Sequence, residues 1–321
     1  MTYGEQCTIA RKAITSAENI CDGTIRGLET TIAGHEAVIT DLRVRLDECL
    51  EGHSTAPVSA GAILLDEVFT PEGLAYGVEH GAHAVPCLFQ VIDGGPPHDG
   101  IIDEEKARLL MSRRAPDGNY DGPLILDIEE PLFSMFLSDD PAVRYKADRI
   151  ALSNVAFLRY LRPFAKIAWW GWPNVPWRIK DENGVERNWP NVSEAIREKA
   201  RAKLRESKLG GELDWLFPAG YLLWGEPNEW CWGQYTAWAT DTCELAAEIA
   251  DGRAVALCTS PRSQLTYPGR PKVLLPMNIW QRLIRVPIDA GVGVGWWDNA
   301  KLTPEQEIER IAALLVALES Q

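Results

Sequence analysis

Long apolar runs and a secretion signal are both missing from the sequence. No stretch of about 18 uninterrupted apolar residues occurs, so no membrane-spanning helix is predicted. The first residues, MTYGEQCTIARKAI, lack the basic start and the continuous apolar core of a secretory signal. We therefore expect a soluble protein without a membrane partner, either cytoplasmic or part of a particle that is released without a signal.

Histidine is scarce and confined to one part of the chain. All five histidines precede residue 99, and the motifs HExxH, GxSxG and GxxxxGK[ST] do not occur. Chemistry in the rest of the chain must therefore depend on carboxylates, Tyr or Lys. A metal hydrolase that uses His80, His83 and His98 remains an alternative. We predict neither a metal nor an organic cofactor.

Basic residues are outnumbered, with 32 Lys and Arg against 46 Asp and Glu, and the formal net charge is -14. Phosphate backbones attract basic faces, so this charge argues against nucleic acid as a partner. The seven cysteines form an odd, widely spaced set without a CxxC pair. This pattern favours reduced thiols in the core over disulfides or metal ligands.

Residues 1–50 are predicted to form a helix with one apolar seam, because apolar side chains recur at heptad spacing. The seam comprises Ile14, Cys21, Ile25, Leu28, Ile32, Ile39, Leu42, Leu46 and Cys49. Two interpretations remain open: a coiled coil that joins copies of the chain through residues 14–49, and a helix or helical hairpin packed on the rest of the protein. Residues 51–61, EGHSTAPVSAG, have the composition of a linker.

Residues 62–321 alternate short apolar runs with amphipathic stretches, which is typical of βα units. Strands are predicted at 84–92, 123–129, 165–172, 214–224, 254–260, 272–278 and 292–297, with 282–288 as a candidate eighth. Helices are predicted at 103–113, 141–162, 192–207, 240–251 and 303–319, the last with Thr303 as its N-cap. The pattern predicts an α/β fold of the (β/α)8 TIM barrel type, possibly distorted, and no GxGxxG follows the first strand to suggest a nucleotide-binding sheet.

The segment LILDIEEP places two carboxylates at the end of a predicted strand. In barrels of this type the active site lies at the C-terminal ends of the strands. Asp127 and Glu129 are two residues apart, so both side chains point to the same face of the strand, toward the barrel mouth. Two close carboxylates disfavour joint ionisation, which keeps one protonated as a general acid, as glycoside cleavage requires. The alternative is that Glu129 and Glu130 begin a solvated loop.

Tryptophan is concentrated after this pair, where all thirteen copies occur. Sugar rings present flat C–H faces that pack on indole, so a cleft lined by Trp suits a saccharide, although core packing explains any single Trp. The substrate-binding candidates at predicted strand ends are Trp170, Trp172, Trp224, Trp296, Trp297, Asn278 and Asp298.

Four segments of the chain fall in the same order as motifs of the hyaluronidase family of glycoside hydrolases. They are LILDIEEP, IAWWGWPNV, LDWLFPAGYLLW and GVGVGWWD, and the resemblance covers about residues 84–300. The segment 127–129 resembles the Asp-Trp-Glu motif with Ile in place of Trp, and 171–173 resembles Gly-Phe-Pro. The segment 217–221 resembles Tyr-Pro-Ser-Ile-Tyr, and 295–297 resembles the late Trp-Gly motif without its closing Gly.

The resemblance implies a barrel glycosidase with Glu129 as general acid/base, Asp127 as the group that orients it and polarises the substrate, and Tyr221 as a hydrogen-bond partner. In that family the nucleophile is the N-acetyl group of the substrate, which implies a saccharide containing N-acetylhexosamine. The cysteines are not placed as in the family, and a charge of -14 suits an anionic polymer poorly.

Other mechanisms and another class of function remain open. A two-carboxylate mechanism would take its second carboxylate from Asp214, Glu226, Glu229 or Asp298, and Schiff-base chemistry would use Lys166 or Lys272. The chain could also be a non-catalytic glycan-binding or structural barrel in a larger assembly, displayed by the N-terminal coiled coil. We predict hydrolysis of a glycosidic bond.

Overall fold

The computed structural model describes residues 61–320 except 67, 90, 92–98, 224–226, 264–272 and 299–301. All of them belong to one compact unit, residues 57–321. The predicted helix or coiled coil at 1–50, its proposed role in joining copies of the chain, and nearly all of the predicted linker lie outside the described residues.

Parallel strands form the centre of this unit. β1 (Ala62–Leu65) pairs with β2 (His83–Val85), and β2 continues through Pro86 into β3 (Cys87–Phe89). β3 pairs with β4 (Pro123–Asp127), which pairs with β5 (Lys166–Trp169). The short interruption at Pro86 lets one run of chain bond to β1 with its first half and to β4 with its second.

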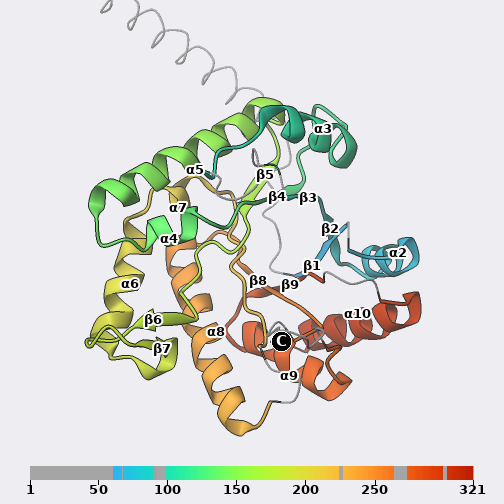
Figure 1. Ribbon diagram of the computed structural model, residues 1–321. Coiled ribbons are helices and arrows are strands. Elements are labelled where there is room, and N and C mark those ends of the chain that lie inside the picture. The colour runs from blue at the N-terminus through green and yellow to red at the C-terminus, as the bar shows by residue number, and fades with distance from the viewer. Residues whose placement is uncertain are drawn as a thin grey trace, which may run out of the picture. The chain divides into compact units, whose positions relative to one another are not determined.

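The remaining strands close a ring. Trp170, directly after β5, bridges to Phe217. The segment that contains Phe217 also bridges, through Leu216 and Ala219, to the next strand around the ring. That strand is β8 (Ala256–Thr259), which pairs in parallel with β9 (Gly293–Trp296), and β9 pairs with β1. Counting β2 and β3 as one strand, six parallel strands and the bridging segment 216–219 form the ring among the described residues. Figure 1 shows the strands at the centre of the unit.

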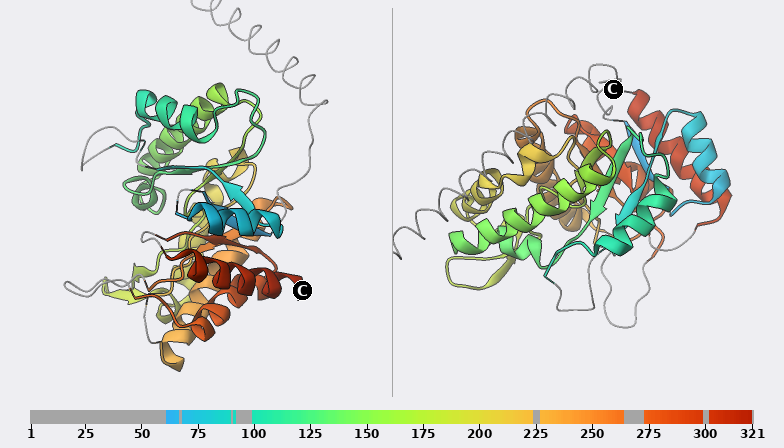
Figure 2. Two further views of the ribbon diagram at one scale, coloured as in Figure 1. Left: turned by 90° about the vertical axis from the view of Figure 1, so that its right-hand side faces the viewer. Right: turned by 90° about the horizontal axis from the view of Figure 1, so that it is seen from above.

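The main helices surround these strands, as the three views show (Figures 1 and 2). They are α2 (Pro71–Glu79), α3 (Glu104–Arg114), α4 (Leu132–Phe136), α5 (Pro141–Leu161), α6 (Glu194–Glu206), α7 (Leu209–Glu212), α8 (Glu229–Ala250), α9 (Met277–Asp289) and α10 (Pro304–Glu319). An antiparallel hairpin of β6 (Arg178–Lys180) and β7 (Glu186–Asn188), followed by a 3-10 turn (Trp189–Asn191), lies between β5 and α6. None of the helices in the described part of the chain has both the length and the apolar character of a membrane span.

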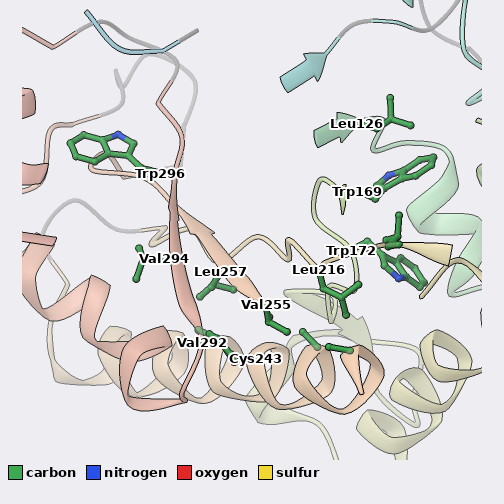
Figure 3. Packing of buried hydrophobic residues seen from close by; sticks show 14 of the residues in the cluster. Leu126, Trp169, Trp172, Leu216, Cys243, Val255, Leu257, Val292, Val294 and Trp296 are labelled. Carbon is green, nitrogen blue, oxygen red and sulfur yellow. The ribbon is translucent and has the colours of Figure 1, made fainter. Parts of the chain in front are cut away.

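Two apolar clusters occupy the two sides of the ring. The outer cluster packs the strands against the helices and includes Leu126, Trp169, Leu257 and Trp296 (Figure 3). The inner cluster comprises Ile63, Leu65, Val85, Cys87, Ile125, Ala168, Trp170, Trp215, Phe217, Ala256 and Cys258. Successive side chains of a strand point to opposite faces, so odd and even positions separate cleanly between the two clusters.

The predicted barrel is therefore confirmed, and five of its helices match the predicted ranges closely or in part. Thr303 caps α10 as expected: its hydroxyl accepts from the Gln306 backbone, and the Gln306 side chain accepts from the Thr303 backbone. β1, α2, α4 and the β6–β7 hairpin were not predicted from the sequence.

The candidate eighth strand at 282–288 is wrong, because these residues form most of α9. Trp280, Leu283, Ile284 and Pro287, four of its six buried residues, recur at the spacing of a helix. The predicted strand 272–278 is also wrong as a barrel strand. Leu274 makes only an antiparallel bridge to Arg262, and the helix begins at Met277.

The inner face of β9 carries glycine, at Gly293 and Gly295, and therefore no side chain. A Cβ atom at Gly295 would overlap the ring of Phe217 and lie 3.2 Å from the Cα atom of Cys258. Phe217 is completely buried inside the ring, so it has little room to move aside. The absence of a side chain at Gly295 therefore leaves the space that the Phe217 ring fills.

We predict that Gly295→Ala lowers the free energy of unfolding by about 1–3 kcal/mol, since overpacking a filled core has roughly that cost. Urea denaturation monitored by tryptophan fluorescence measures the change. The control is Gly211→Ala in α7, where an added Cβ meets no atom within 4 Å. Equal stability of the two variants would contradict the proposed close fit.

Candidate active site

Asp127 and Glu129 lie at the C-terminal end of β4, in phase with an inward residue. Ile125 belongs to the inner cluster, whereas Leu126 and Ile128 belong to the outer one. The indole N–H of Trp169 donates to the carbonyl oxygen of Ile128 at 2.8 Å, which holds this segment from the outer side. The charges of Asp127 and Glu129 both act on the same buried hydroxyl and thiol, those of Tyr221 and Cys258. The two carboxylates therefore share the mouth of the barrel.

The environment of Glu129 shifts its pKa upward. The residue as a whole is exposed, yet the protein atoms around its carboxyl group remove part of its water and raise its pKa above the ordinary value for Glu. The indole N–H of Trp170 donates a hydrogen bond to the carboxylate and acts in the opposite direction, while the negative charge of Glu130 raises the pKa further. The shift has the direction that a general acid needs, but loss of water is its first cause, and the charge that adds to it is that of Glu130 and not, as predicted, that of Asp127.

A thiol and a phenol lie below the carboxylates. The hydroxyl of Tyr221 and the Sγ atom of Cys258 are 3.6 Å apart. Burial raises the pKa of both groups well above their ordinary values, so both remain protonated near neutral pH. The adjoining backbone is fixed to β8, since the N–H of Gly220 donates to the carbonyl of Cys258 at 2.7 Å. Tyr221 is thus a rigidly placed hydroxyl on the carboxylate side of the barrel.

Three aromatic rings form one side of this mouth. Trp170 packs against Trp297 with 5.7 Å between ring centroids, and Tyr221 lies 6.3 Å from Trp170 and 5.6 Å from Trp297. Trp170 is buried, whereas Tyr221 and Trp297 are half-buried at the edge of the inner cluster. These three predicted site residues are therefore brought together with the carboxylates.

Two other tryptophans predicted to line the cleft point to the outer layer instead. Trp296 is one residue out of phase with Trp297 and packs between β9 and the helices, against Phe69 at 4.9 Å and Trp280 at 5.1 Å. Trp172 follows the turn at Gly171, which has φ +69°, and packs on Phe136 at 4.5 Å. It also lines a cavity between the segments that follow β4 and β5. Alternation alone separates Trp296 from Trp297, whereas Trp172 is in phase with the inward Trp170 and is directed outward by the turn at Gly171. Trp224 lies outside the described residues.

The two polar substrate-binding candidates also occupy other surroundings. Asn278 is exposed in the first turn of α9, because the strand predicted to end there does not form. Asp298 is 4% exposed and accepts from Nε of Arg262 at 3.0 and 3.1 Å. This buried ion pair joins the segments that follow β8 and β9, so the Asp298 carboxylate is committed to Arg262.

Asp214 and Lys166 lie at the opposite end of the barrel from the mouth, and Glu229 is paired with a basic residue. Asp214 accepts from the backbone N–H of Ile167 at 2.7 Å, near the start of β5, and pairs with Arg159. Lys166 is the first residue of β5, at the opposite end of the strand from the site. Glu229 is the exposed first residue of α8 and pairs with Arg282 at 3.0 Å. Glu226 and Lys272 lie outside the described residues.

Two histidines of the metal-hydrolase alternative, His80 and His83, lie near the N-terminal end of β2. His83 begins β2, and His80 caps α2 just before it, where its ring stacks on Tyr76. Within the residues that the structure describes, no group of three or more His, Cys, Asp or Glu side chains is arranged to hold a metal ion. His98 is outside those residues.

Cys258 lies at the site but was not predicted from the sequence as a site residue. The alternation used for Asp127 and Glu129 would have found it, since Ala256 and Cys258 are the inward residues of the predicted strand 254–260. No sequence pattern predicts the hydrogen bond from Trp170 to Glu129, because it joins residues that follow two neighbouring strands.

Comparison with solved structures shows which fold this is. The fold resembles that of bee venom hyaluronidase, with a TM-score of 0.56, 16% sequence identity, and coverage of 81% of this chain and 99% of the other. Bee venom hyaluronidase in complex with a hyaluronic acid tetramer gives a TM-score of 0.53 and 16% identity, with coverage of 80% and 98%. No protein-family model and no curated protein sequence matches the chain. The hyaluronidase-like barrel fold implied by the four motifs is confirmed.

We predict that Trp170→Phe raises the pKa of Glu129, because the indole N–H that stabilises the ionised carboxylate is removed. Carbon-13 NMR titration of labelled Glu carboxyl groups, assigned with Glu129→Gln, measures the shift without a substrate. Trp215→Phe is the matched control, since Trp215 is also an inward tryptophan, but its N–H donates to the carbonyl of Lys166. An unchanged or lower pKa in Trp170→Phe would refute the assignment.

Proposed function

We propose that the chain is a glycoside hydrolase that acts on a saccharide containing N-acetylhexosamine, with Glu129 as general acid/base. One observation carries the proposal: a strand-end carboxyl group whose burial raises its pKa stands at the barrel mouth with a second carboxylate. The hyaluronidase-like fold and the aromatic rings of Trp170, Tyr221 and Trp297 support it.

In the proposed mechanism, protonated Glu129 donates its proton to the glycosidic oxygen as the bond to the anomeric carbon breaks. The carbonyl oxygen of the neighbouring N-acetyl group forms a bond to that carbon, and Asp127 orients the amide and stabilises its developing positive charge. Ionised Glu129 then takes a proton from the water that opens the cyclic intermediate. Tyr221 donates a hydrogen bond to the acetamido group.

Substrate assistance agrees with the described carboxylates. Asp214 lies near the start of β5, Glu229 is exposed and pairs with Arg282, and Asp298 is bound by Arg262, so none of the three is placed as a protein nucleophile. With the substrate as nucleophile, one acid and one stabilising carboxylate on β4 suffice.

Replacement of Glu129 is the direct test. We expect Glu129→Gln to lower kcat by about 10²–10⁴-fold, the contribution typical of a general acid. The measurement is reducing-end release from a panel of polysaccharides that includes chitin and hyaluronan oligomers. Glu79→Gln, an exposed glutamate at the end of α2, should retain full activity. Full activity in Glu129→Gln would overturn the proposal, and binding without turnover by the wild type would favour a glycan-binding barrel.

The pH dependence follows from the raised pKa of Glu129. The proton-donating form is lost as the pH rises through that pKa, so activity should fall on the basic side. Because burial raises the pKa, this fall should occur at a higher pH than for an ordinary glutamate. The pH profile of kcat/KM measures it, and a profile that falls at the pKa of an ordinary glutamate would contradict this role.

A further inference from the structure

A cavity of about 790 Å³ adjoins the catalytic segment. Its walls come from residues 130–139, which follow β4, from residues 172–182, which follow β5, and from one side of α6. Barrel enzymes bind their substrates with the segments that follow the strands. The volume lies within the range of about 300–1,000 Å³ that is usual for small-ligand pockets.

The cavity combines an apolar floor with a charged rim. The apolar lining residues are Phe133, Leu137, Trp172, Pro176, Ile179, Ile196, Ala200 and Leu204. The charged lining residues are Glu130, Asp139, Asp181, Glu182, Arg178, Lys180, Lys199 and Lys203, four acidic and four basic. The rim therefore has no net charge, although the whole chain carries -14.

Contacts within the rim show which charges are already balanced. Asp139 lies 2.7 Å from Nζ of both Lys199 and Lys203, and these ammonium groups lower its pKa to about 2. Asp181 pairs with Arg187 at 3.2 Å. Among the described residues, the ammonium group of Lys180 has no ion pair or hydrogen bond, and Arg178 reaches Glu186 only at 3.9 Å. Both are exposed on β6, so they are the cations free to meet a ligand.

These properties suit a neutral ligand with many hydroxyl groups. A rim without net charge offers little to an ionic ligand, whereas hydroxyls can donate to its carboxylates and accept from its cations. The apolar floor can pack against the C–H faces of sugar rings.

The cavity is joined to the catalytic acid through the chain. Glu130, which lines the cavity, directly follows Glu129 and accepts from the Ser134 hydroxyl at 2.6 Å. This bond ties α4, one wall of the cavity, to the end of the catalytic segment. A glycan cleaved at Glu129 that extends toward α4 would enter the cavity.

We propose that this cavity is a subsite for the sugar units of the substrate that lie beyond the cleaved bond, with Arg178 and Lys180 as hydrogen-bond donors to their hydroxyls. The proposal rests on the proposed function for the class of ligand. It makes the enzyme one that acts on chains, because a short saccharide would leave the cavity empty.

Oligosaccharide length tests the proposal. In the Glu129→Gln background, which prevents turnover, titration calorimetry with N-acetylglucosamine oligomers of two to six units gives the dissociation constants. We expect the affinity to rise with length, and Arg178→Ala/Lys180→Ala to weaken binding of the hexamer about tenfold, equal to about 1.4 kcal/mol, without affecting the dimer. Lys146→Ala, an exposed lysine of α5 that does not line the cavity, should leave both constants unchanged.

The outcomes separate this proposal from the proposed function. Equal length dependence with and without Arg178 and Lys180 would overturn the subsite while leaving Glu129 as the acid. Length-dependent binding that the double variant abolishes, combined with no turnover by the wild type, would support the subsite and overturn the hydrolase. No binding of any oligomer would overturn the subsite as proposed.

Discussion

The strict alternation of side chains along a closed ring of parallel strands is the constraint on which the rest of this structure depends. Pairing of β9 with β1 gives each strand two neighbours, so every side chain must face either the interior or the surrounding helices. On β4 this choice places Ile125, Asp127 and Glu129 on one side and the apolar residues between them on the other. Asp127 and Glu129 are thus held at the mouth by the same packing that fills the core.

The alternation also explains how much the sequence could predict. The runs LILD and KIAW stand out because buried parallel strands are continuously apolar, and their last inward residues follow by counting. Trp296 and Trp297 show the limit, since adjacent residues of one type face opposite sides and only the register decides which reaches the mouth. The strand predicted at 282–288 was wrong because its apolar residues are also compatible with a strand, whereas in the structure they are buried on a helix. The Asp298–Arg262 pair joins residues 36 apart and leaves no local pattern.

The electrostatics of the site are those of a carboxyl group between opposing influences. Removal of water raises the pKa of Glu129, and the Trp170 N–H limits that rise. A residue that must give up a proton and later recover one benefits from such a balance, since too high a pKa would prevent ionisation and too low a pKa would prevent protonation. Trp170 serves the barrel twice, with its ring packed on Phe217 at 5.6 Å and its N–H directed to the acid. Interior packing and acid strength are therefore coupled through one side chain.

The contact between Gly295 and the Phe217 ring restricts which substitutions this barrel can accept at the two positions. Two positions that share one volume vary together: a smaller residue at 217 makes room for a side chain at 295, and a large residue at 217 demands glycine there. Both lie on the inner wall beside Cys258, so an exchange of bulk between them would reshape the floor below Tyr221 while leaving the strand pairing intact. In related sequences this would appear as paired substitution, which would change the size of the barrel interior without changing its frame.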